Sequence, residues 1–119
     1  MKLMPGAAGG STTLRGETFT GEVWGTPVLA EPDVTVNLVS FLPGARTFWH
    51  FHERGQILVM TSGTGLVCVE GSEPVPVRHG DVVWIEPGER HWHGADSNST
   101  LVHLAITLGD TTWLNEVDN

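Results

Sequence analysis

The chain has 119 residues, of which six are Lys or Arg and fourteen are Asp or Glu, for a formal net charge of −8. This length suits one compact domain, and a single cysteine excludes an internal disulfide. The acidic balance, with basic residues scattered along the chain, argues against nucleic acid and anionic membranes as partners.

Residues 1–12 are rich in Gly, Ala, Ser and Thr, which predicts a flexible N-terminal arm ahead of a single domain at residues 13–119. The sequence has no apolar segment of signal-peptide length. No run approaches the roughly 20 apolar residues that span a bilayer. We therefore expect a cytoplasmic protein.

Fifteen glycines and seven prolines interrupt the chain at short intervals, which is typical of an all-β sandwich or barrel. Strands are predicted, in chain order, at residues 17–24, 34–41, 46–52, 56–61, 65–70, 75–77, 82–86, 91–93 and 101–108. Turns are predicted at 42–44, 62–65, 70–72, 79–81 and 86–88, and residues 113–117 could form a short helix or a strand. The apolar run at 56–61 indicates a central strand that is buried on both faces.

His50 and His52 are two residues apart in a predicted strand, so both imidazoles point to the same face. Two adjacent imidazoles are costly in a core because all their ring nitrogens need polar partners, and a metal ion satisfies one nitrogen of each ring. Gln56 follows a turn at 53–55 that can return its side-chain oxygen to the two histidines. His93 follows His91 by two residues and shares its face if that strand is regular.

Two segments have the spacing of known motifs. Residues 44–63 resemble the first cupin motif through Gly44, His50, His52, Gln56 and Gly63, and residues 80–91 resemble the second through Gly80, Gly88 and His91. Three positions depart from the pattern: Gln56 replaces an acidic residue, Glu86 replaces Pro, and Ala95 replaces Asn. The neutral Gln56 removes a negative charge, so a bound metal would be a stronger Lewis acid but would be held more weakly.

A longer series of segments is similar to the small bacterial cupins that include the manganese-dependent hydroxynitrile lyases, a group also described as carboxymuconolactone decarboxylase-like. The segments are Pro43 to His52, Gly55-Gln56, Gly80 to Trp84, Pro87 to Ala95 and His103 to Ile106. The resemblance implies a jelly-roll barrel (a double-stranded β-helix). It implies one divalent metal ion per chain on His50, His52, Gln56 and His91.

The same resemblance places Thr47, His93 and His103 at the open coordination site as catalytic residues, and Asn37, Val39 and Thr107 in the substrate pocket. Mn(II) is favoured by the resemblance, but three histidines and one oxygen also suit Fe(II), Zn(II), Ni(II) and Co(II).

The leading hypothesis is a lyase in which a Lewis-acid metal and a histidine acid/base cleave a C–C bond of a small-molecule substrate, as hydroxynitrile lyases do. One alternative is a dioxygenase that uses Fe or Mn, and another is a non-catalytic cupin that binds a small molecule. An apolar first strand around Phe19, Val23 and Trp24 predicts a homodimer or homotetramer.

Overall fold

A computed structural model describes residues 1–5 and 11–118 of the chain. The predicted N-terminal arm at 1–12 therefore lies partly outside the described residues. Two of its described residues contact the third strand: Lys2 forms an ion pair with Glu31 at 2.8 Å, and the Thr12 and Thr26 hydroxyls are 2.6 Å apart. No helix of the described part is long and apolar enough to cross a membrane.

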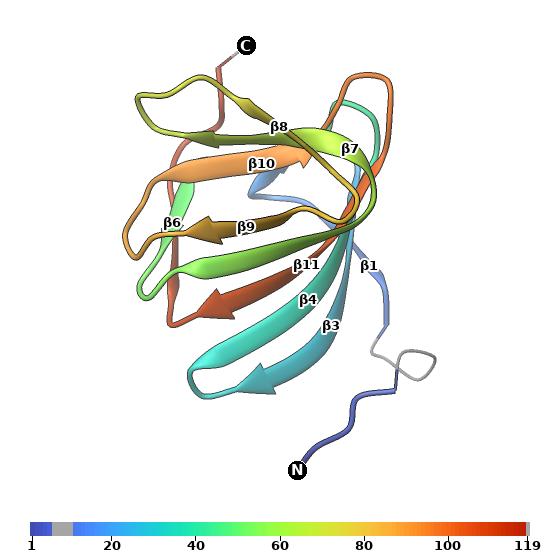
Figure 1. The fold of residues 1–119 in the computed structure, drawn as a ribbon, viewed down its shortest axis with the longest axis vertical. Helices are drawn as coiled ribbons and strands as arrows, with labels where there is room; N and C mark the ends of the chain where they lie inside the picture. The colour runs from blue at the N-terminus through green and yellow to red at the C-terminus, as the bar shows by residue number, and fades with distance from the viewer. Residues whose placement is uncertain (6–10, 119) are drawn as a thin grey trace.

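The fold is the all-β barrel that the sequence predicts, built from two antiparallel sheets (Figure 1). The first sheet contains, in spatial order, β1 (Thr13–Arg15), β3 (Val23–Glu31), β4 (Val34–Phe41), β11 (Leu101–Leu108), the first part of β7 (Gln56–Val69) and β9 (Val82–Ile85). The second contains β8 (Val75–Arg78), the last part of β7, β10 (His91–Ala95), β5 (Arg46–Thr47), β2 (Phe19–Thr20), β6 (His50–His52) and β12 (Thr111–Trp113).

Strand β7 belongs to both sheets and joins them. The turn predicted at 62–65 is wrong, because the strand continues through this segment and pairs with β8 and β10 beyond it. Gly63 lies where β7 passes from the first sheet to the second. Its φ is +83°, and a Cβ at this position would lie 1.8 Å from the Thr100 carbonyl oxygen. Only glycine combines this backbone conformation with so close an approach.

The strands predicted at 34–41 and 101–108 are confirmed as β4 and β11. The strand predicted at 17–24 is wrong as a single element, because Gly21 has a φ of +81° and separates β2 from β3. Strand β3 then continues through Pro27, where the register with β4 shifts and the missing N–H is tolerated. The segment 46–52 is likewise divided into β5 and β6, and 113–117 forms neither a helix nor a strand beyond Trp113.

The barrel interior changes from apolar to polar along its strands. Residues that pair across β4 and β11 share a face, so the interior is layered: Phe41 with Leu101, then Val39 with His103, then Asn37 with Ala105, and last Thr35 with Thr107. The layer formed by Phe41 and Leu101 is fully buried and continues the hydrophobic core of Val23, Leu58, Met60 and Ile85. The polar layers open into a cavity.

Candidate metal centre and active-site cavity

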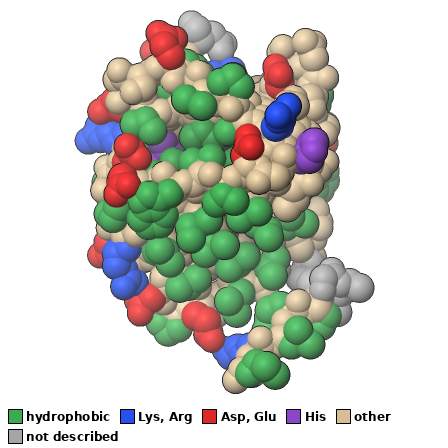
Figure 2. Space-filling model, in the orientation of Figure 1, with side chains coloured by type: hydrophobic (Ala, Val, Ile, Leu, Met, Phe, Trp, Pro, Cys, Tyr) green, Lys and Arg blue, Asp and Glu red, His purple; other side chains and the backbone are tan. Residues whose placement is uncertain are grey.

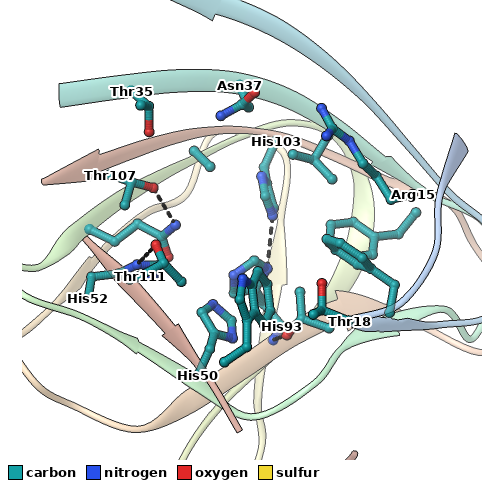
Figure 3. Close-up of a pocket in the computed structure, with 17 residues that line it drawn as sticks. Arg15, Thr18, Thr35, Asn37, His50, His52, His93, His103, Thr107 and Thr111 are labelled. Atoms are coloured by element: carbon teal, nitrogen blue, oxygen red, sulfur yellow. Dashed lines mark hydrogen bonds between the residues drawn. The ribbon is translucent and has the colours of Figure 1, made fainter. Parts of the chain in front are cut away.

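A cavity of about 330 Å³ lies at the polar end of the barrel interior, between the two sheets (Figure 3). Every predicted site residue except His91 lines it: Asn37, Val39, Thr47, His50, His52, Gln56, His93, His103 and Thr107. His91 is fully buried beside the cavity, and its Nε2 atom lies 3.2 Å from Oε1 of Gln56. The fold thus brings together residues from six strands and collects all ten predicted positions in one place.

Three histidine rings are held by acceptors on their Nδ1 side. The Nδ1 atoms of His50 and His91 donate to the backbone carbonyls of Phe48 (2.8 Å) and Glu89 (2.9 Å), and His52 Nδ1 lies 2.8 Å from the Thr111 hydroxyl. A neutral imidazole that donates from Nδ1 carries a lone pair on Nε2. This is the tautomer and the support that metal-binding histidines use.

The side chain of Gln56 also presents an acceptor to this cluster. Its Nε2 atom donates to the Thr107 hydroxyl at 3.0 Å, which turns Oε1 toward His91. Because His91 donates from Nδ1 to Glu89, the Nε2 atom of a neutral His91 has no hydrogen to offer Oε1. Two lone pairs therefore face each other at 3.2 Å, which a shared cation would stabilise.

The spacing and the unpartnered atoms of the cluster also fit a metal ion. His50, His91 and His93 each offer a ring nitrogen, and these atoms lie within 4.8 Å of one another, so this triad could hold a metal ion. The ring of His52 lies 5.0 Å from that of His50, centroid to centroid. In the described part of the chain, the Nε2 atoms of His52 and His93 are buried without a hydrogen-bond partner, and a cation would satisfy them.

The grouping of His93 with His50 and His91 differs from the ligand set implied by the resemblance, which has His52 and Gln56 instead. His50 and His52 of β6 and His91 and His93 of β10 lie close together, because β6 pairs with β10 at His50 and His91. The two sets share His50 and His91, and the metal content of a His93→Ala variant distinguishes them.

The histidine cluster is neutral near pH 7. Burial lowers the pKa of His103 to about 4, and burial together with neighbouring His91 lowers the pKa of His52 to about 4. Burial, followed by the charges of neighbouring histidines, lowers the pKa of His50 and His93 well below the usual value. Burial also lowers the pKa of His91. Neutral imidazoles keep the lone pairs that both metal binding and proton transfer require.

His93 and His103 form a hydrogen-bonded pair deeper in the cavity. His103 Nε2 lies 3.0 Å from His93 Nδ1, so the two rings share one proton. The far nitrogens, Nδ1 of His103 and Nε2 of His93, have no hydrogen-bond partner among the described residues. The ring of Phe41 packs against both imidazoles. Thr47 is buried, and its hydroxyl accepts a hydrogen bond from the backbone N–H of His93 at 3.2 Å. Thr47 therefore positions the strand that carries His93.

Comparison with known proteins decides the family. A family model for the cupin domain matches residues 37–107, which is more than half of the chain and includes every predicted site residue. The chain belongs to the cupin family. This cupin is 47% identical over 91 residues to a protein named (R)-mandelonitrile lyase from Granulicella tundricola. The aligned region covers 74% of this chain and 70% of that relative. The expected closeness to hydroxynitrile lyase-like cupins is thereby confirmed, and the comparison supports a cupin enzyme.

Solved structures agree with this cupin's architecture. A cupin-like protein from Thermotoga maritima superposes with a TM-score of 0.86 at 38% identity, covering 93% of this chain and 89% of that one. A predicted oxalate decarboxylase from the same organism superposes with a TM-score of 0.79 at 21% identity, covering 92% of this chain and all of that one, and it shows the shared fold alone.

The cavity of this cupin also contains residues that sequence reasoning missed. Thr111 and Trp113 come from β12, and the Trp113 ring packs against the His50 ring with centroids 4.5 Å apart. Arg15 comes from β1 and Thr18 from the turn between β1 and β2, and Thr35 shares a face of β4 with Asn37. The two-residue spacing from Asn37, which places Thr35 on the same face of β4, was the local signal that could have identified Thr35.

Proposed function

We propose that this cupin is a metal-dependent lyase that cleaves a C–C bond beside an oxygen-bearing carbon, with cyanohydrin cleavage as the reaction to test first. The observation that supports it most is the collection of neutral, buried histidines in one cavity, with ring nitrogens unpartnered both in the cluster and in the His93–His103 pair. The name of the Granulicella relative supports the same class of reaction.

His50, His52, Gln56 and His91 would hold the metal ion, Mn(II) by preference. When bound, a divalent cation supplies Lewis acidity that stabilises negative charge on the substrate oxygen. Gln56 contributes a neutral oxygen rather than a carboxylate, so it leaves the positive charge of the site undiminished. It also cannot accept a proton, and the proton must therefore be moved by other residues.

The His93–His103 pair is placed to carry that proton. In the proposed reaction the substrate O–H proton passes to an unpartnered ring nitrogen, His103 Nδ1 or His93 Nε2. The C–CN bond breaks, its electron pair leaves with cyanide, and the O–H electron pair forms the carbonyl. Because burial lowers the pKa of both rings, the protonated pair readily returns the proton to cyanide, which regenerates the neutral pair.

The test measures metal content per chain and mandelonitrile cleavage on the same preparations, using untagged protein purified without added metal. We expect about one Mn or Fe per wild-type chain. Gln56→Ala should contain much less metal, and His103→Ala should keep its metal but lose most turnover. A fully active His103→Ala variant would contradict the proton-transfer role. Wild-type protein that stays metal-free after incubation with Mn(II) would reject the metal-dependent lyase in favour of a non-catalytic binding protein.

His93→Ala separates the two metal-ligand sets. Loss of metal from this variant would place His93 among the ligands, whereas retained metal with lost turnover would place it with His103 in proton transfer. Repeating the assay without oxygen tests the dioxygenase alternative, because a lyase needs no oxygen and its rate should be unchanged.

We also propose that the protein forms a homodimer or homotetramer. Of the three apolar residues expected at the interface, Val23 is fully buried and Phe19 lines the cavity, whereas Trp24 is half-buried and pairs with the exposed Leu14 of β1. Two apolar rows also cross the outer face of the first sheet. One runs Leu29, Val36, Ile106, Ile57 and Trp84, and the other runs Leu38, Leu104, Val59 and Val82.

This outer face carries no charged residue in either row, and Figure 2 shows hydrophobic side chains gathered over it with charged side chains around its margin. Two copies that each carry a formal charge of −8 can approach along an uncharged face with the least repulsion. Val82→Lys should convert the assembly to a monomer in light scattering, because Val82 is 66% exposed in one row. Val75→Lys is the matched control, since Val75 is similarly exposed, at 59%, but lies on β8, outside the rows. A wild-type monomer would reject the assembly.

A further inference from the structure

The cavity contains one residue with a permanent charge, Arg15 on β1. It is half-buried and lines the same cavity as the histidine cluster. No Asp or Glu of the described residues lines this cavity, although the chain as a whole is strongly acidic. Within residues 1–5 and 11–118, no carboxylate lies within ion-pair distance of the Arg15 guanidinium. The cavity therefore has an uncompensated positive charge.

A glycine makes room for the Arg15 side chain. A Cβ at Gly25 would lie 2.2 Å from Nε and 2.8 Å from Cζ of Arg15, so the guanidinium group rests directly over the backbone of β3. Gly25 pairs with Val39, and Val39 pairs with His103, which forms one row across the inward face of three strands. Adjacent strands are about 4.8 Å apart, so Gly25 and His103 are separated by roughly 10 Å.

Figure 3 shows Arg15 extending from its strand toward the side of the cavity where Asn37 and His103 lie. A ligand that contacts the guanidinium group at one end can therefore reach the histidine cluster at the other. The fixed cation lies on one side of the cavity, whereas the neutral imidazoles of His50 and His52 lie on the other.

We propose that the substrate carries a carboxylate that Arg15 binds, with the reacting carbon at the histidine cluster; this inference rests on the proposed function. Arginine presents two parallel N–H donors that match a carboxylate. Asn37 and Thr18, which also line the cavity, offer further polar groups nearby. A negative charge is favoured because nothing else in the cavity neutralises Arg15. The substrate therefore differs in charge from the neutral mandelonitrile after which the relative is named.

The experiment compares two unreactive probes that differ only in charge, 4-(hydroxymethyl)benzoate and 4-(hydroxymethyl)benzamide, by calorimetric titration of the Mn-incubated full-length protein. Wild-type protein should bind the carboxylate about tenfold more tightly than the amide, in line with one charge-assisted contact. Arg15→Gln should abolish the preference, and Arg15→Lys should keep part of it. Arg78→Gln makes the same change in net charge at an exposed position outside the cavity and should keep the full preference.

Equal binding of both probes by wild-type protein, binding of neither, or an undiminished preference in Arg15→Gln would overturn the inference. A second assay, cyanide release from the cyanohydrins of 4-formylbenzoate and 4-formylbenzamide, tests the carboxylate site and the lyase function separately. An Arg15-dependent binding preference without cleavage of either cyanohydrin would reject the lyase but retain the carboxylate site. Cleavage of both at equal kcat/KM would retain the lyase and reject the carboxylate site.

Discussion

The contact between His52 and Thr111 allows the proposed metal site to be tested without altering a proposed ligand. Thr111 is paired with His52 across β12 and β6, and its hydroxyl lies 2.8 Å from His52 Nδ1. Thr111→Val has nearly the same shape as threonine but removes the hydroxyl. The Nδ1 atom of a ring that is 2% exposed then loses its partner, and the ring loses what fixes its orientation.

Loss of such a supporting hydrogen bond lowers metal affinity by about 10- to 100-fold, which corresponds to about 1.4 to 2.8 kcal/mol. Competition between the protein and a chelating dye for Mn(II) measures this change. Thr111→Ser keeps the hydroxyl and should bind as wild type does. Thr112→Val is the matched control, because Thr112 is exposed and is paired with Phe51 rather than with a histidine.

Urea unfolding of all variants in EDTA shows whether the metal-free fold is intact. Equal metal affinity in Thr111→Val and wild type would refute the reasoning, because His52 would then be oriented by something other than Thr111. Equal losses in Thr111→Val and Thr112→Val would refute it as well, since the effect would come from β12 as a whole.

Two further predictions concern stability. The pKa values of His52 and His103 are lowered to about 4 in the folded protein, so below about pH 6.5 the unfolded chain binds protons more readily than the folded one. The free energy of unfolding of the metal-free protein should therefore fall as pH falls from about 6.5 to about 4. At about pH 5 the loss should be about 2 kcal/mol for each ring. Urea midpoints that agree at about pH 7.5 and about pH 5 would contradict this. Gly71→Ala should lower the free energy of unfolding by roughly 1 kcal/mol, and Gly63→Ala should lower it by well over that amount. Both glycines have positive φ, but only at Gly63 would a Cβ meet a carbonyl oxygen. Similar denaturant midpoints for the two variants would show that the backbone at Gly63 and Thr100 can shift to admit a side chain.

Local patterns predicted the parts of the site that lie on regular strands. The two-residue spacing of His50 and His52 indicated a shared face, and both are buried at the cavity. The alternation in 34–41 and 101–108 gave β4 and β11 with their bounds. In each case the period of two survives into the structure because these strands are paired on both sides and remain regular.

The missed residues depend on pairings between distant parts of the chain. Thr111 and Arg15 reach the cavity because β12 pairs with β6 and β1 pairs with β3, and neither pairing leaves a local pattern in the sequence. The segment around Gly63 was misread for a related reason. Its glycines are typical of a turn, but the close approach of Thr100 makes glycine necessary within a strand.

The pairing of β6 with β12 also has a consequence for the order in which the protein matures. His50 and His52 leave the ribosome long before residues 111–113, whose strand supports them, and before His91 and His103. Pairings between such distant segments form late, since the intervening chain must first be ordered. A nascent chain that ends before His91 therefore presents only His50 and His52 of this cluster, as two adjacent imidazoles. The ring orientations that the proposed metal site requires exist only in the completed barrel.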